Sequence, residues 1–215
     1  MKSDKEKEFK EILESINNYI PELMKAGKWL VEANPHIYKF DLICTSILNR
    51  SVNFHKAFIS LVHENNFIAA APIVRVHMDS MLRLYASQLI DYNIDEFAQK
   101  ILDGEQVGKM KDRDKQQMSD GYLARKISEE EGMDWVKNIY AQGSGYVHFS
   151  NLVTGQSIGY NKKEGILNGR IRLDDDLVPL GEKIAASVCM MKVSNKIADM
   201  IMGWVEQKRS YPKEI

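Results

Sequence analysis

Residues 67–90 make a segment that is apolar on every side of a helical wheel, although Arg75, His77, Asp79 and Arg83 lie within it. A helix without a polar face is normally buried in the core of a protein. A buried guanidinium or carboxylate must be paired and hydrogen-bonded, because an isolated charge in an apolar interior is strongly unfavourable. We therefore predict a central helix whose charged side chains find partners inside the fold, either structural groups or a bound ligand.

The length and composition of the chain indicate the class of protein to which this helix belongs. With 215 residues and a hydrophobic content of 44%, the chain can bury one core, and we expect a single domain over residues 1–215. The formal net charge of −1 argues against a surface that is basic as a whole and would attract nucleic acids or membranes. The charged N-terminus lacks the apolar core of a signal peptide, and no uncharged apolar run reaches the ~20 residues of a membrane span. We expect a soluble cytoplasmic protein without membrane contacts.

Apolar side chains recur with helical periodicity through most of the chain. The pattern predicts long helices at about 4–33, 38–63, 67–90 and, after an acidic cap at 174–176, up to about 204. It predicts shorter helices at 94–102, 122–131 and 134–142. Pro21 predicts a kink or a break in the first helix, and Gly143 and Gly145 predict the end of the helix that precedes them.

Two segments depart from the helical pattern. Residues 104–121 are polar and bracketed by glycines, which predicts a mobile loop. Residues 153–160 and 166–173 have strand-like content around a turn that ends in glycine, which predicts a hairpin. The sequence therefore predicts an all-α fold, a helical bundle of about five to seven helices with a small β-hairpin insert at 153–173, before the last helix.

Arg75, Asp79 and Arg83 follow one another at intervals of four residues, which stacks three charges along one edge of a helix. In a functional interpretation, Asp79 orients Arg75 so that the remaining guanidinium donors meet a phosphate or a carboxylate. In a structural interpretation, the three side chains form a half-buried ion network that sets the register of the helix. The sequence leaves both interpretations open.

A second group of candidate residues surrounds His148, which has aromatic neighbours and follows two glycines. Such a histidine is a candidate acid or base, or a hydrogen-bond donor to phosphate, and Tyr146 and Asn151 lie close to it in the chain. The alternative is a capping or core histidine that is bonded to the backbone. Glycines beside an aromatic cluster also suggest a backbone that another group can approach closely.

Arg50 and His55 form an Arg-x4-His pair on the second predicted helix. This pair resembles the Arg-x(4–6)-His element of the HEPN superfamily, helical proteins that include metal-independent ribonucleases of bacterial toxin and defence systems. The resemblance implies an RNA substrate and an active site built across a two-fold homodimer.

A broader resemblance covers residues 40 to 152. The succession Asn66-Phe-x-Ala-Ala-x-Pro-x-Val-Arg75-x3-Asp79, followed late in the chain by Val-His148-x-Ser, is similar to a group of uncharacterised bacterial helical proteins. In that group an Arg-x3-acid helix follows a long helix and a Val-His-x-Ser element comes late. No reaction can be transferred from this group to the present chain.

Two functional hypotheses follow, and neither includes a cofactor or a metal, because the chain has no Gly-rich phosphate loop and no metal-type spacing of His, Glu or Cys. The first is a HEPN-like ribonuclease in which His148 and His55 serve as acid and base while Arg75 and Arg50 hold the phosphate. The second is a non-catalytic helical module that binds a small anionic ligand, such as a nucleotide, or a partner protein. The anion-binding candidates are Arg75, Asp79, Arg50, Arg83, Tyr146 and Asn151.

Overall fold

A computed structural model describes residues 2–148, 150–161, 165–169, 171 and 173–212 of the chain. Within this part the structure has eight α-helices, one 3-10 turn and two short strands. Their bounds are α1 (Lys2–Glu32), α2 (Lys39–His63), α3 (Phe67–Ala86), α4 (Ile94–Leu102), η1 (Val107–Lys109), α5 (Asp120–Ile127), α6 (Trp135–Val147), α7 (Asn151–Ser157), β1 (Ile158–Asn161), β2 (Ile166–Gly169) and α8 (Leu180–Arg209).

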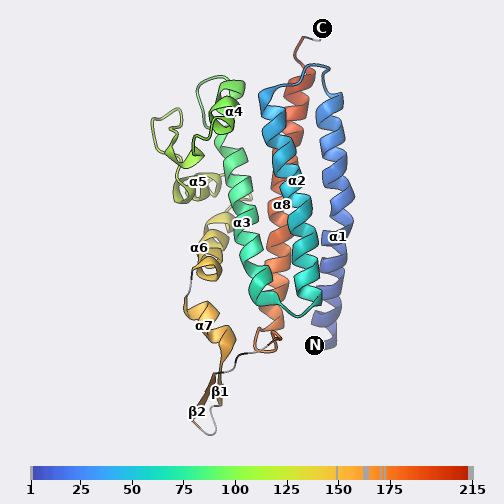
Figure 1. Cartoon of the computed structure of the whole chain (residues 1–215), viewed down its shortest axis with the longest axis vertical. Helices are drawn as coiled ribbons and strands as arrows, with labels where there is room; N and C mark the ends of the chain where they lie inside the picture. The colour runs from blue at the N-terminus through green and yellow to red at the C-terminus, as the bar shows by residue number, and fades with distance from the viewer. Residues whose placement is uncertain (1, 149, 162–164, 170, 172, 213–215) are drawn as a thin grey trace.

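Four long helices pack as a bundle in which α1 and α3 each contact both α2 and α8. Figure 1 shows that α2 runs antiparallel to the other three helices and that α4 to α7 descend along the outer side of α3. This descent returns the chain to the end of the bundle where α8 begins. The all-α helical bundle that the sequence predicts is confirmed, but the described residues form eight helices and not five to seven, since α7 replaces part of a predicted strand. No helix among the described residues is long and apolar enough to cross a membrane.

The first helix continues without a break through Pro21, so the predicted division into two helices is wrong. Its buried face carries apolar residues at helical spacing, namely Leu13, Ile16, Leu23, Ala26 and Leu30. A proline inside a helix frees the carbonyl four residues earlier, here that of Asn17. Both Pro21 and Asn17 are exposed. Water can therefore hydrate the freed carbonyl, while the buried apolar face holds the helix together.

The segment around α6 and α7 differs from the sequence-based prediction in two ways. Helix α6 does not end at Gly143 and Gly145 but extends to Val147. Residues 153–157, predicted as a strand, belong to helix α7. The Thr154 hydroxyl donates to the Ser150 carbonyl at 3.0 Å, a bond that a threonine rotamer permits within a helix. Strands β1 and β2 pair antiparallel, with Ile158 opposite Gly169.

The loop between α4 and α5 is anchored by the buried carboxylate of Asp112. Its Oδ1 accepts hydrogen bonds from the backbone N–H groups of Asp114 and Gln116 at 3.0 and 2.8 Å, and its Oδ2 accepts one from Tyr122. Two methionines of the same loop, Met110 and Met118, are buried in the core. A segment that the sequence suggested to be a mobile loop therefore has a fixed conformation with its own apolar anchors.

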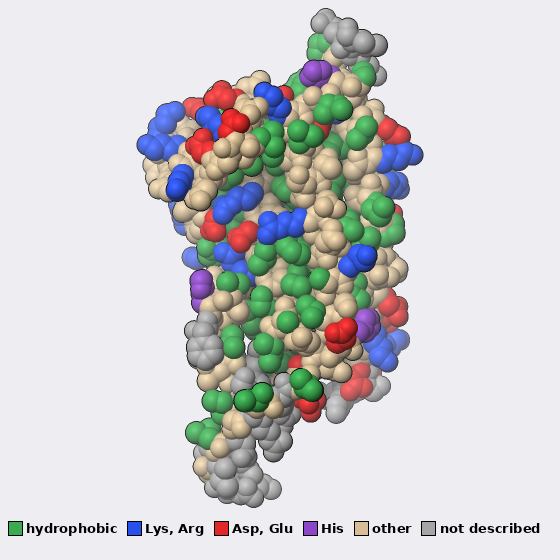
Figure 2. All heavy atoms as spheres, in the orientation of Figure 1, with side chains coloured by type: hydrophobic (Ala, Val, Ile, Leu, Met, Phe, Trp, Pro, Cys, Tyr) green, Lys and Arg blue, Asp and Glu red, His purple; other side chains and the backbone are tan. Residues whose placement is uncertain are grey.

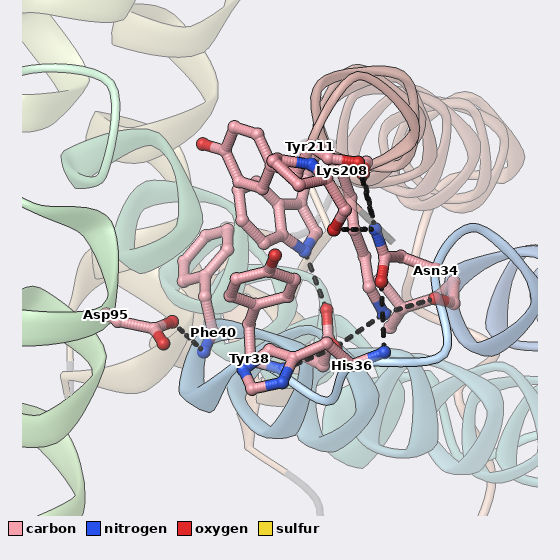
Figure 3. Close-up of polar contacts among 11 residues, drawn as sticks. Asn34, His36, Tyr38, Phe40, Asp95, Lys208 and Tyr211 are labelled. Carbon is pink, nitrogen blue, oxygen red and sulfur yellow. Dashed lines mark hydrogen bonds and ion pairs between the residues drawn. The ribbon is translucent and has the colours of Figure 1, made fainter. Parts of the chain in front are cut away.

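A buried ion pair closes the end of the bundle where α1 and α8 finish and α2 begins (Figure 3). Lys208 is 1% exposed, and its Nζ donates to Asp41 Oδ2 at 2.7 Å and to the Leu30 carbonyl at 3.0 Å. The other carboxylate oxygen of Asp41 accepts the Trp204 indole N–H at 2.8 Å. Asn34 adds a contact from its Nδ2 to the Lys208 carbonyl at 3.4 Å. We name this group the Lys208 clamp, and it joins three helices.

Replacement of Lys208 by methionine is expected to lower the free energy of unfolding by about 3–5 kcal/mol, because it leaves the Asp41 carboxylate buried without its cation. The measurement is urea-induced unfolding followed by circular dichroism. Lys28→Met on α1 is the matched control, since the Lys28 side chain is 70% exposed and its pair with Glu32 spans 3.6 Å. Equal and small effects of the two substitutions would contradict a structural role for the clamp.

Candidate functional site

The charged side chains of α3 are paired inside the fold, as the sequence predicts. Arg75 is only 8% exposed, and its Nη1 pairs with Asp79 Oδ1. The second acidic partner is Asp120, the first residue of α5: its carboxylate pairs with Arg83 Nη2 and lies 3.9 Å from Arg75 Nη2. The sequence suggested Asp79 as the residue between the two arginines, but Asp120 links them. Two arginines and two aspartates thus form one nearly neutral network.

Helix α6 covers the Arg75 side chain. The guanidinium lies 4.2 Å from the ring centroid of Tyr140, a cation–π contact. Gly143 faces the aliphatic part of the same side chain, and a Cβ atom at Gly143 would lie 3.0 Å from Arg75 Cδ and 3.1 Å from Arg75 Cβ. Glycine is needed here because the two helices approach so closely. This contact explains why Gly143 lies inside a helix and does not end it.

A groove of about 520 Å³ lies where the end of α3 meets the α4–α5 loop. Its charged and polar lining consists of Arg83, Lys109, Asp120, Gln106, Gln117 and Ser119. Lys109 is exposed, and the Arg83 side chain is 33% exposed. The buried Nη1 of Arg83 has no hydrogen-bond partner in the described part of the chain. The groove lining therefore has two cationic side chains, Arg83 and Lys109, and one acidic side chain, Asp120.

Two histidines and a serine form a buried network in the middle of the bundle. His55 on α2 and His77 on α3 are both 0% exposed. Their Nε2 atoms lie 3.2 and 2.9 Å from the hydroxyl oxygen of Ser194 on α8. The Nδ1 of His55 lies 2.8 Å from the Ser51 carbonyl, so it carries the proton and leaves Nε2 of the neutral ring able to accept from Ser194. The Nδ1 of His77 is buried without a partner among the described residues.

Burial keeps both histidines of this network neutral. Loss of solvation lowers the pKa of His55. The same effect, with smaller contributions from the charge of Arg50 and from repulsion by His55 when that ring is also protonated, lowers the pKa of His77 to about 3. Arg50 itself is exposed, and its guanidinium lies 5.0 Å from the ring centroid of Phe54. The Arg50–His55 pair thus has one member on the surface and one in the core.

The residues around His148 lie at the end of α6. His148 is exposed, and its backbone N–H donates to the Ser144 carbonyl at 2.9 Å. The Tyr146 hydroxyl donates to Glu182 Oε2 at 3.3 Å, and Asn151 is exposed at the start of α7. Within the described residues, no hydrogen bond or ion pair joins His148 to Arg75 or His55. The structure brings Arg75, Asp79 and Arg83 together but not the two candidate catalytic histidines.

Asp120 and Lys208 are among the residues of these networks that the sequence pattern did not single out. Asp120 follows Arg83 by 37 positions, and no local pattern links them. Lys208 did leave a signal, since it continues the buried stripe of Ile197, Ile201 and Trp204 at helical spacing. No group of three His, Cys, Asp or Glu side chains in the described ranges is arranged to hold a metal ion.

Acidification is expected to destabilise the protein through His77. The unfolded histidine takes up a proton near its ordinary pKa of 6.5, whereas the folded one does so only at about 3. Stability is therefore complete above pH 6.5 and falls between 6.5 and 3, by up to about 1.4 kcal/mol per pH unit. His77→Gln should flatten this slope in urea unfolding measured from pH 7 to pH 4. His63→Gln, at an exposed position of α2, should leave the slope unchanged.

Alanine at Gly143 is expected to lower stability, although alanine favours helix over glycine by about 1 kcal/mol. The added Cβ atom would meet Arg75 Cβ, which cannot move away without a shift of α3. Gly203→Ala on α8 is the matched control, because nothing lies within 4 Å of a Cβ atom there and the substitution should raise the midpoint of thermal unfolding. If both substitutions raised the midpoint equally, the close approach of α6 to Arg75 would be disproved.

Comparisons of this chain with known proteins find no match. No model of a known protein family matches it, and no curated protein matches it. No solved structure matches it either. The interpretation of the site therefore starts from the residues described above.

Proposed function

We propose that this protein is a non-catalytic helical module that binds a small anionic ligand in the groove beside Arg83. The observation that carries the proposal is the lining of this groove, where Arg83 and Lys109 border a volume of about 520 Å³. Guanidinium and ammonium groups bind phosphate and carboxylate oxygens through charge-assisted hydrogen bonds. The Arg83 side chain is 33% exposed, so part of it borders the groove although its Nη2 pairs with Asp120.

The balance of charge in the groove favours an anion. Asp120 is the acidic residue of the lining, and Arg75 and Arg83 both lie against its carboxylate. Lys109 has no acidic partner among the described side chains, so its charge remains uncompensated. Figure 2 shows Lys and Arg side chains interspersed with Asp and Glu side chains on the lobe that the α4–α5 region forms. The attraction for an anion therefore comes from the groove lining itself, where Lys109 and Arg83 lie beside the single carboxylate of Asp120.

The groove has a rigid wall. The loop that carries Lys109 is fixed by the hydrogen bonds to the Asp112 carboxylate and by the buried side chains of Met110 and Met118. Its backbone is also tied to the turn that follows α3, because the Arg113 N–H donates to the Leu89 carbonyl at 2.9 Å. A binding site whose walls are already ordered loses less entropy when a ligand binds.

The geometry gives less support to the ribonuclease hypothesis than to the binding-module hypothesis. An acid and a base that act on one phosphodiester must both reach the same substrate. His55 is fully buried and both of its ring nitrogens lie within hydrogen-bonding distance of Ser51 and Ser194. His148 is exposed at the end of α6. Arg75 is covered by α6 and neutralised by Asp79 and Asp120, so it is occupied before any phosphate arrives.

Pyrophosphate is a suitable probe for the groove, and isothermal titration calorimetry measures its binding. Lys109→Gln should weaken the affinity by about tenfold, because one charge-assisted contact is lost. Lys111→Gln changes the same charge in the same loop but outside the groove lining, and it should leave the affinity unchanged. The proposal fails if pyrophosphate does not bind, or if both substitutions weaken binding equally, which would indicate diffuse attraction only.

Labelled total RNA incubated with the protein in EDTA separates the two functional hypotheses. We expect no cleavage above a buffer control. Cleavage by the wild-type chain that is abolished in His148→Ala, with pyrophosphate binding retained, would replace the binding module with a metal-independent ribonuclease.

A further inference from the structure

A second cavity, separate from the groove, lies between α3, α6 and α8 and has a volume of about 100 Å³. Small side chains on all three helices create it, since Ala71, Gly143 and Ala186 line it where larger residues would fill the space. Gly143 cannot be larger because Arg75 lies against it on the α3 side. The close approach of α6 to Arg75 and the cavity toward α8 therefore occur at the same turn of α6.

The cavity lining has an apolar part and a polar part. Val74, Ile139 and Cys189 belong to the apolar part, and Val74 and Cys189 are buried. Gln142, Tyr146 and Glu182 form the polar part, with the tyrosine hydroxyl donating to Glu182 Oε2 at 3.3 Å. An apolar body with a few well-placed polar groups is the usual composition of a small-molecule site.

Glu182 determines the charge that such a site accepts. It carries the one charged side chain of the cavity lining, and within the described part of the chain it has no cationic partner. Burial, with a smaller effect from Glu182, raises the pKa of Tyr146 to about 12, so the phenol stays protonated and acts as a donor to the carboxylate. The remaining acceptor capacity of the carboxylate is available to a ligand. The tyrosine ring beside it also favours a cation.

We propose that this cavity binds a small organic ammonium ion, with its alkyl group over Val74, Ile139 and Cys189 and its nitrogen beside the Glu182 carboxylate and the Tyr146 ring. Size limits the alkyl group. A cavity of about 150 Å³ in a helical protein accommodates benzene, so one of about 100 Å³ takes a smaller body, such as a branched chain of four carbons. A carboxylate or phosphate ligand is disfavoured by the like charge of Glu182.

Isobutylammonium chloride is the probe, and its binding to the full chain is followed by two-dimensional NMR through the amide signals of Gly143 and Cys189. The expected dissociation constant is about millimolar, given so few non-hydrogen atoms. Isobutanol and isobutyrate have the same carbon skeleton with a neutral and a negative head group. Both should bind at least several times more weakly. If isobutanol bound as tightly as isobutylammonium, the assignment of a cation site would be overturned.

Two variants locate the site. Glu182→Gln keeps an acceptor for the Tyr146 hydroxyl but removes the charge, and it should weaken isobutylammonium binding by about tenfold. Glu206→Gln makes the same change on an exposed part of α8, where Glu206 pairs with Arg209, and it should have no effect. Ala186→Leu fills the cavity and should abolish binding while the midpoint of thermal unfolding stays the same or rises. Binding that survives in Ala186→Leu, or that weakens equally in Glu206→Gln, refutes the proposal.

Discussion

The pairing of Arg75 and Arg83 with Asp79 and Asp120 is the interaction on which the arrangement around α3 depends. Helix α3 has no polar face, so its two guanidinium groups can enter the core only with their counter-charges. Asp79 is supplied by α3 itself, whereas Asp120 is supplied by α5. This requirement fixes α5 beside the end of α3, and the cover that α6 places over Arg75 follows from it. The groove and the ammonium cavity are both bordered by these helices.

A buried ion pair holds helix α8 in the bundle at each of its ends. At its C-terminal end Lys208 pairs with Asp41 of α2. At its N-terminal end the buried carboxylate of Asp175 accepts Lys183 Nζ at 2.5 Å and the backbone N–H of Phe67, at the start of α3, at 3.1 Å. A buried ion pair contributes little net stability but is costly to break. Two such pairs at opposite ends therefore fix the position of α8 along the bundle axis, which apolar packing alone specifies less sharply.

Much of the fold could be predicted from the sequence, and the errors have physical causes. Apolar periodicity located the long helices, since each of them buries one face. The need for internal partners on α3 could be predicted from the cost of a buried charge, but Asp120 could not be identified as one of them, because this pairing is decided by tertiary packing. The low helix propensity of glycine predicts a helix end at Gly143. In the structure, glycine is needed at this position inside α6 because the Arg75 side chain lies against it. His55 was a candidate catalytic base, yet its environment in the core depends on Ser194, which is distant in the chain.

The parallel course of α3 and α8 has a consequence for how the chain reaches its native state. These helices cannot form a hairpin, and the segment between them must first run the length of the bundle (Figure 1). The contacts of α8 with α1 join nearly the two ends of the chain, as between Leu30 and Lys208, which are 178 positions apart. Such long-range closure slows folding, because loop entropy is lost before the contacts are gained. During synthesis, the apolar faces of α1 to α3 stay uncovered until the last helix leaves the ribosome, which makes this interval the time of greatest exposure to aggregation or to a chaperone.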